Sequence, residues 1–192
     1  MKRFKFEVVF SALLFVFWVI LVSAAVGVAA DIPKLNTPAV ITSLGQSPDA
    51  YCVSVLAKRA KLSVGFEKLI SAENLEGYKT LLMTVGASLK GFGSAGVNLD
   101  TEIARGKRII KTAKDKHIFL VVVHSGGVGR RESMSDKLLN VVAKEADFLL
   151  IYKESNKDGY FTDVAKKYNI PIEIVNKVID MQSVLKEMFL SE

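Results

Sequence analysis

The sequence predicts an α/β fold, a doubly wound and mostly parallel sheet of five to six strands in a flavodoxin-like arrangement. Short apolar runs alternate with longer amphipathic stretches along the chain, which is typical of repeated strand–helix units. One run, residues 118–123, is apolar throughout, as expected for a strand covered by helices on both faces. Right-handed crossovers would then join neighbouring parallel strands.

Short length, apolar character and β-branched or aromatic residues mark the strands. The predicted strands are Ala39–Ser43, Phe66–Ile70, Thr80–Val85, Ile118–Val123, Phe148–Tyr152 and Ile172–Val175.

Helical spacing of apolar residues marks the helices, as in the stripe formed by Ile103, Gly106, Ile110 and Ala113. Ser47 is suited to cap the first helix, with Pro48 in its first turn. The predicted helices are Pro48–Lys61, Leu99–Lys116, Ser133–Glu145, Phe161–Tyr168 and Val178–Leu190.

Residues 1–30 are predicted to be a signal peptide or a transmembrane anchor. Three basic residues precede an apolar run at 8–22, and the small residues Val28 and Ala30 suit a signal-peptidase site. The uncharged stretch 8–30 is also long enough to span a bilayer. Positive residues keep that end cytoplasmic, so either alternative predicts an extracytoplasmic protein, secreted, periplasmic or anchored facing outward. A linker is predicted at 31–38 and a single domain at 39–192.

Composition excludes several classes of protein. Half of the residues are hydrophobic, which excludes a disordered chain. The formal net charge is +6, of which residues 1–30 contribute +2, so the predicted domain is only mildly basic. No nucleic-acid partner is expected at this charge. The single cysteine, Cys52, excludes an internal disulfide and is expected to be buried in an apolar helix.

Ligands of open parallel sheets bind beyond the carboxyl ends of the strands. The segments predicted to leave those ends are rich in glycine, and a loop of 13 residues is expected at 86–98. Ordinary turns would also explain the glycines. The four segments are Gly45–Ser47, Gly86–Asn98, His124–Glu132 and Lys153–Gly159.

Two nucleotide-binding motifs are matched only in part. Gly91, Gly93 and Gly96 match the spacing G-x-G-x-x-G, but this motif neither directly follows its strand nor belongs to the first strand. The Lys-Ser/Thr pair of a phosphate-binding P-loop is missing, because Val97 and Asn98 stand there. No cofactor is therefore expected, and Gly91 and Gly93 remain candidates for backbone approach to another ligand.

The densest polar cluster follows the strand at 118–123. It contains His124, Ser125, Gly126, Gly127, Arg130 and Arg131. Two guanidiniums beside a glycine-rich turn could hold a carboxylate or phosphate, although solvated arginines and a structural histidine are the alternatives. Asp158 is a further candidate, or simply a turn residue. No metal site is expected, because His117 and His124 lie at opposite ends of one strand.

Four short motifs stand out in the second half of the chain. They are His124-Ser-Gly-Gly, Arg130-Arg131, Ser135-Asp136-Lys137 and Asn156-Lys157-Asp158-Gly159. These motifs resemble those of an uncharacterised family of exported bacterial α/β domains. The resemblance would cover Pro38 to Phe189, and it implies export and an α/β fold but no activity.

Three functions fit these observations. The first is an extracytoplasmic module that binds a small anionic ligand at the loops 86–98 and 124–131. The second is an envelope interaction or structural protein, with a protein partner and no small-molecule site. The third is a hydrolase that would use His124 and Ser125 with Asp49 or Asp158. A membrane would be contacted through residues 1–30 if they are retained.

Overall fold

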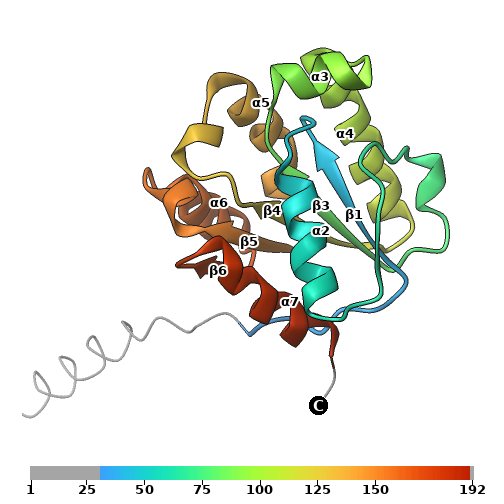
Figure 1. Cartoon of the computed structure of the whole chain (residues 1–192), viewed down its shortest axis with the longest axis vertical. Helices are drawn as coiled ribbons and strands as arrows, with labels where there is room; N and C mark the ends of the chain where they lie inside the picture. The colour runs from blue at the N-terminus through green and yellow to red at the C-terminus, as the bar shows by residue number, and fades with distance from the viewer. Residues whose placement is uncertain (1–30, 191–192) are drawn as a thin grey trace, which may run out of the picture.

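The computed structural model describes residues 31–190, which form one sheet of six parallel strands in the order β2-β1-β3-β4-β5-β6 (Figure 1). This confirms the predicted fold class, and the first five strands have the flavodoxin-like order. The strands are β1 Ala39–Leu44, β2 Val64–Phe66, β3 Thr80–Val85, β4 Phe119–His124, β5 Phe148–Tyr152 and β6 Ile172–Val175.

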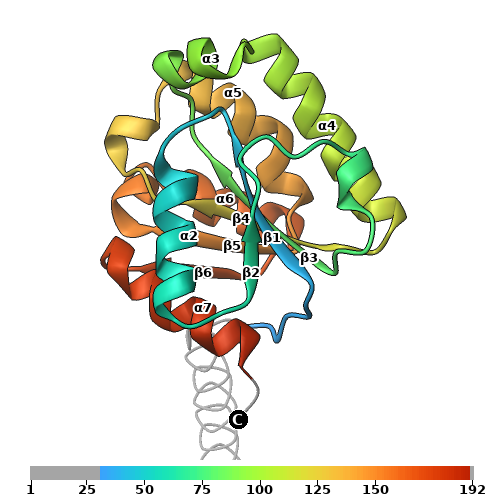
Figure 2. The same cartoon turned by 45° about the vertical axis from the view of Figure 1, so that its right-hand side comes forward.

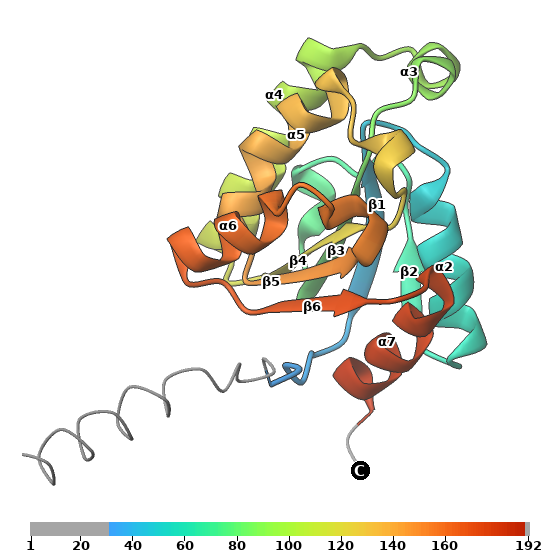
Figure 3. The same cartoon turned by 90° about the vertical axis from the view of Figure 1, so that its left-hand side faces the viewer.

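Helices cover both faces of the sheet. Helices α2 and α7 pack on one face, whereas α4, α5 and α6 pack on the other (Figure 3). The predicted helices are all present with their ends shifted by up to three residues, and residues 143–145 and 178–180 are 3-10 turns. The helices are α2 Asp49–Arg59, α3 Leu89–Ala95, α4 Leu99–Asp115, α5 Ser133–Val142, α6 Tyr160–Tyr168 and α7 Met181–Phe189.

Strand register places apolar side chains in rows across the sheet. Ile41, Leu82 and Val121 are aligned in one row and face α2 and α7. Each is at most 1% exposed, and full burial of such a side chain contributes about 1.5–3 kcal/mol. Because helices bury such rows on both faces of the sheet, successive residues of these strands are apolar.

The chain leaves the adjacent strands β1 and β3 toward opposite faces of the sheet. From β1 it enters α2 on one face, and from β3 it passes through α3 into α4 on the other (Figure 2). Such a switch point opens a crevice at the carboxyl ends of the two strands, where doubly wound domains bind ligands.

Two predicted elements are wrong. The strand expected at Phe66–Ile70 is β2 at Val64–Phe66, because this edge strand pairs only with β1 and Ile70 is buried in the core on the α4 side instead. The expected 13-residue loop contains α3. Two glycines lower the helix propensity of α3, but the Ser88 side chain caps it and the buried Phe92 anchors it.

Cys52 is exposed, contrary to expectation. The buried side of α2 is formed by Ala50, Val53, Leu56 and Ala57. Cys52 lies on the opposite, solvent-facing side of the helix. The sequence around Cys52 has few polar residues, so its pattern did not show which side of the helix packs on the sheet.

The predicted linker lies along the domain. The Leu35 amide donates to the Met188 carbonyl at 2.7 Å, and Leu35 is 8% exposed. The Thr80 hydroxyl donates to the Asn36 carbonyl at 2.8 Å. The segment predicted as a signal or anchor, 1–30, lies outside the described residues. Within residues 31–190 no helix is both long enough and apolar enough to cross a membrane.

Candidate functional site at the carboxyl edge

The loops that follow β1, β3 and β4 meet at the carboxylate of Asp49. Arg130 Nε lies 3.5 Å from Asp49 Oδ2, and the Ser47 hydroxyl donates to the same oxygen at 3.0 Å. Arg130 Nη1 also donates to the Ala87 carbonyl at 3.4 Å. These contacts join three strand ends across the switch point, so Asp49 and Arg130 occupy the place where the fold predicts a ligand.

Two glycines allow the backbone to approach this carboxylate. A Cβ on Gly126 would lie 2.8 Å from Asp49 Oδ2 and 2.0 Å from Arg130 Cγ. A Cβ on Gly86 would lie 3.2 Å from the same oxygen and 3.0 Å from Ser47 Oγ. A side chain at either position would therefore push the Asp49–Arg130 pair apart.

Arg130 keeps donors that an external anion could use. It ends a short 3-10 turn, Val128–Arg130, and 32% of its side chain is exposed. Its contacts of 3.5 Å to Asp49 and 3.4 Å to Ala87 are long for charge-assisted hydrogen bonds. The guanidinium could exchange these contacts for a carboxylate or phosphate at little cost.

Arg131 is held in a different way. Its guanidinium donates to Asp136 Oδ1 at 2.8 Å, to the Ser155 carbonyl at 2.7 Å, and to both oxygens of Asp158 at 2.9–3.0 Å. It also lies 4.6 Å from the centre of the Tyr160 ring. Only 8% of the side chain is exposed. These bonds join the loops after β4 and β5, and of the two arginines only Arg130 keeps a substantial exposed fraction.

His124 lies beneath the loops. Its Nδ1 is 2.9 Å from Ser155 Oγ, which also accepts from the Gly127 amide at 3.0 Å. The ring is fully buried, packs on Phe161 and leaves Nε2 without a hydrogen-bond partner among the described residues. Burial lowers the pKa of His124 to about 4, so the ring is neutral near pH 7. Its partner is Ser155 and not Ser125, which gives the hydrolase alternative no support.

Two hydroxyls beneath the start of α2 are functional candidates that the sequence analysis missed. Ser43 and Thr84 are register partners on β1 and β3, and the alternation of side chains points both toward α2. Both are fully buried, and neither side-chain oxygen has a hydrogen-bond partner within residues 31–190. Ser43 and Thr84 are each the second-to-last residue of a mostly apolar strand, and this matching position was the available signal.

A buried ion pair fixes the loop after β1 and was also missed. Glu102 Oε2 accepts from the Gly45 amide at 2.7 Å and from Gln46 Nε2 at 2.9 Å, while Arg105 binds the same carboxylate. Burial would raise the pKa of Glu102, but the charge and hydrogen bonds of Arg105, with those of the loop, lower it below its usual value. The pair holds Gly45 and Gln46 at positive φ, just before Ser47.

Gly91, Gly93 and Asp158, which the sequence also suggested, have other surroundings. A Cβ on Gly91 would lie 2.1 Å from the Gln46 carbonyl, so this glycine lets α3 pack on the loop after β1. Gly93 faces open space. The Asp158 carboxylate, 57% exposed, is occupied by Arg131 and the Tyr160 amide.

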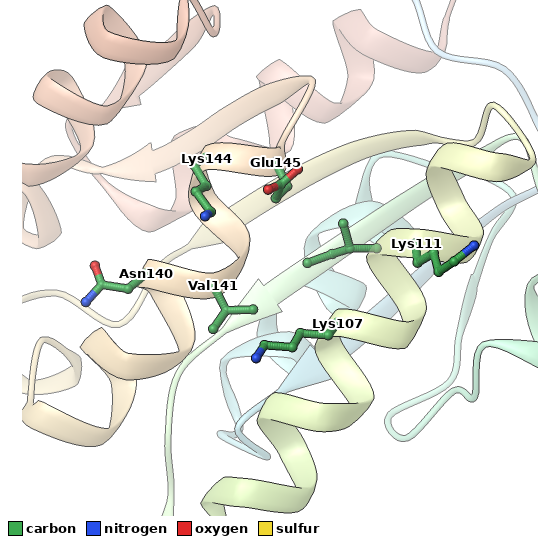
Figure 4. Close-up of a pocket in the computed structure, with 7 residues that line it drawn as sticks. Lys107, Lys111, Asn140, Val141, Lys144 and Glu145 are labelled. Carbon is green, nitrogen blue, oxygen red and sulfur yellow. The ribbon is translucent and has the colours of Figure 1, made fainter.

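A groove of about 430 Å³ lies away from this edge, between α4 and α5. In Figure 4, Lys107 and Val141 face each other across the groove. Lys111 instead pairs with Asp115 on its own helix at 2.6 Å. The groove is open and its polar groups do not converge, so it does not match the ligand sites of doubly wound domains. No cluster of three or more metal-binding side chains occurs in the described part of the chain.

The fold and the carboxyl edge define a doubly wound α/β domain whose strand-end loops carry one accessible guanidinium at the switch point. The chain belongs to the family described as Domain of unknown function (DUF6305), whose profile matches residues 36–189. This confirms the resemblance to an uncharacterised family. Comparison with curated proteins gives no match. The motifs behind the resemblance lie together, because Arg131 bonds both Asp136 and Asp158.

Proposed function

We propose that this protein is an extracytoplasmic binding domain that holds a small carboxylate or phosphate on Arg130. The observation that carries the proposal is the contrast between the two neighbouring arginines. Arg131 is fully engaged by carboxylates and a carbonyl, whereas Arg130 is partly exposed and makes only long contacts at the switch point. Extracytoplasmic placement rests on the sequence of residues 1–30.

Asp49 acts as an internal competitor in this proposal. Its carboxylate occupies the position beside Arg130 that an external anion would take, and a ligand would displace it. The amides at the start of α2 add a favourable field for an anion. Ser43 and Thr84 add buried hydroxyls beneath the same helix end, which could bind a ligand oxygen directly or through water.

The test is a ligand screen by thermal unfolding of the full chain purified in detergent. The panel contains carboxylates, phosphates, sulfonates and nucleotides. A ligand at 100 times its dissociation constant adds about 2.7 kcal/mol of stability. For a protein of this size that raises the melting temperature by roughly 5–10 °C.

Arg130→Ala should abolish the shift, and Arg59→Ala is the matched control because Arg59 is an exposed arginine at the far end of α2. An equal shift in Arg130→Ala would overturn the proposed site. If no compound of the panel stabilises the protein, the proposal that it binds these ligand classes is overturned, and the second candidate function is favoured.

The second candidate is an envelope interaction protein. Three large apolar side chains are exposed on segments of the carboxyl edge, namely Tyr51 at 59%, Leu89 at 71% and Val128 at 55%. Tyrosine is among the residue types enriched at protein interfaces. Photo-crosslinking in cells from position 89, with position 107 as control, tests this function. A discrete adduct from position 89 alone supports it, and equal adducts or none contradict it.

A further inference from the structure

The edge opposite the candidate site is basic. Every strand of the parallel sheet begins there, and so the preceding helices end there. The segments at this edge carry eleven basic and six acidic side chains. These segments are 31–38, 58–63, 76–79, 114–118, 143–147, 166–171 and 186–190.

The topology gathers these charges on one side. Lys58 and Arg59 end α2, and Lys166 and Lys167 lie in the last turn of α6. Basic residues at helix C-termini complement the helix dipole, which explains why each individual helix ends in positive charge. Because all strands run in one direction, separate helix ends become one surface, which we call the basic edge. Lys61, exposed and outside any helix, extends it beyond what the dipole explains.

Several acidic groups at this edge are already engaged. Glu145 pairs with Lys114, and Glu76 pairs with Lys116 at 3.0 Å. The Asp147 carboxylate accepts from the Leu120 amide at 2.7 Å. The exposed lysines of α2 and α6 therefore face solvent with little opposing charge.

The described chain begins at this same edge. Residues 31–38 run between the end of α7 and the start of β3, where Leu35 bonds Met188 and Asn36 bonds Thr80. In Figure 2 the C-terminal ends of α2 and α7 lie at the same side as the first described residues. The preceding sequence holds the 23 uncharged residues 8–30, which are long enough to span a bilayer. A retained span would place the basic edge against the membrane.

We propose that the basic edge docks on the headgroups of an anionic lipid bilayer, so that the candidate site at the carboxyl edge points away from the membrane. Each lysine near an anionic surface raises binding about fivefold, and the attraction falls off within a Debye length. This inference concerns a different face from the proposed ligand site, and each can fail without the other.

Lysine acylation followed by mass spectrometry tests the proposal. The full chain is reconstituted in phosphatidylcholine vesicles with or without about 30% phosphatidylglycerol, a content chosen to give a negative surface potential. Lys58, Lys61 and Lys166 should react at least about threefold more slowly with the anionic lipid present. Lys90 and Lys153, which are exposed at the carboxyl edge, are internal controls and should react equally in both vesicles.

The protection should disappear at about 1 M salt, where the Debye length is about 3 Å. The double variant Lys61→Glu/Lys166→Glu should lose protection at Lys58, whereas Lys90→Glu/Lys153→Glu should keep it. Equal reactivity of Lys58 in the two vesicle types would overturn the proposal. Equal protection of the control lysines would also overturn it, because contact would then not be confined to the basic edge.

Discussion

The guanidinium of Arg131 forms a two-bond fork with the carboxylate of Asp158, with Nη1 3.0 Å from Oδ1 and Nη2 2.9 Å from Oδ2. Asp136 and the Ser155 carbonyl complete the set of acceptors. One side chain thereby ties the loop after β4 to the loop after β5. The neighbouring Arg130 stays partly exposed, as the proposed ligand site requires.

Replacing Arg131 is expected to destabilise the fold. Arg131→Ala removes the donors of two carboxylates and a carbonyl and should cost about 2–3 kcal/mol of unfolding free energy, because 92% of the arginine side chain is shielded from solvent. Arg131→Lys keeps the charge but not the fork and should cost less. Chemical denaturation measures both, with Arg59→Ala as the neutral control. A loss below about 0.5 kcal/mol for Arg131→Ala would contradict this role.

Stability should fall as the pH is lowered from about 6.5 to 4. The folded-state pKa of His124 is about 4 against an ordinary 6.5, so over this window the unfolded chain takes up a proton that the buried ring does not. Linkage then removes about 3 kcal/mol of stability. Glu102 adds a loss only below about pH 4.5, because its folded pKa is lowered from there.

Denaturation at several pH values checks this prediction. His124→Asn removes the titrating group and should flatten the profile between pH 6.5 and 4. An unchanged pH dependence in that variant would show that other groups dominate.

Two glycines of the same helix should respond in opposite ways to alanine. Gly91→Ala places a Cβ 2.1 Å from the Gln46 carbonyl and should cost about 2–3 kcal/mol. Gly93→Ala meets no atom within 4 Å and should be neutral or stabilise by up to about 1 kcal/mol through helix propensity. Equal melting temperatures for the two variants would contradict the packing of α3 on the loop after β1.

Asp49→Asn should tighten the binding of an anion. The variant keeps the shape of the side chain and removes the charge that competes for Arg130 at 3.5 Å. A partly exposed pair of this kind is worth up to about 1 kcal/mol, which predicts up to about fivefold tighter binding. Calorimetric titration of the panel hit measures the change. Weaker binding in Asp49→Asn would mean that Asp49 contacts the ligand instead of competing with it.

The parts of the fold that depend on local pattern were predictable. The bounds of β3, β5 and β6 agree with the sequence analysis to the residue, because each is a short apolar run between polar segments. Helix α3 was not predicted because its stability comes from Ser88 and Phe92, while its glycines suggest a loop. An average propensity cannot reveal a cap and one buried anchor.

The candidate site was predictable in location but not in detail. The fold class places the strand-end loops, whereas the two carboxylates that bind Arg131 lie 5 and 27 residues away along the chain. Glu102 and Arg105, spaced as i and i+3, resemble an exposed helical pair, although both are buried. Which of two adjacent arginines stays accessible depends on tertiary contacts that a single sequence does not show.

Calorimetric titration with the anion found by the ligand screen tests the central claim most directly. It compares the unmodified chain, Arg130→Ala and Arg59→Ala at one ionic strength and pH. If Arg130 holds the anion, Arg130→Ala should lower the affinity at least about tenfold, equivalent to about 1.4 kcal/mol, and Arg59→Ala should leave it unchanged. Unchanged affinity in a folded Arg130→Ala protein would contradict it.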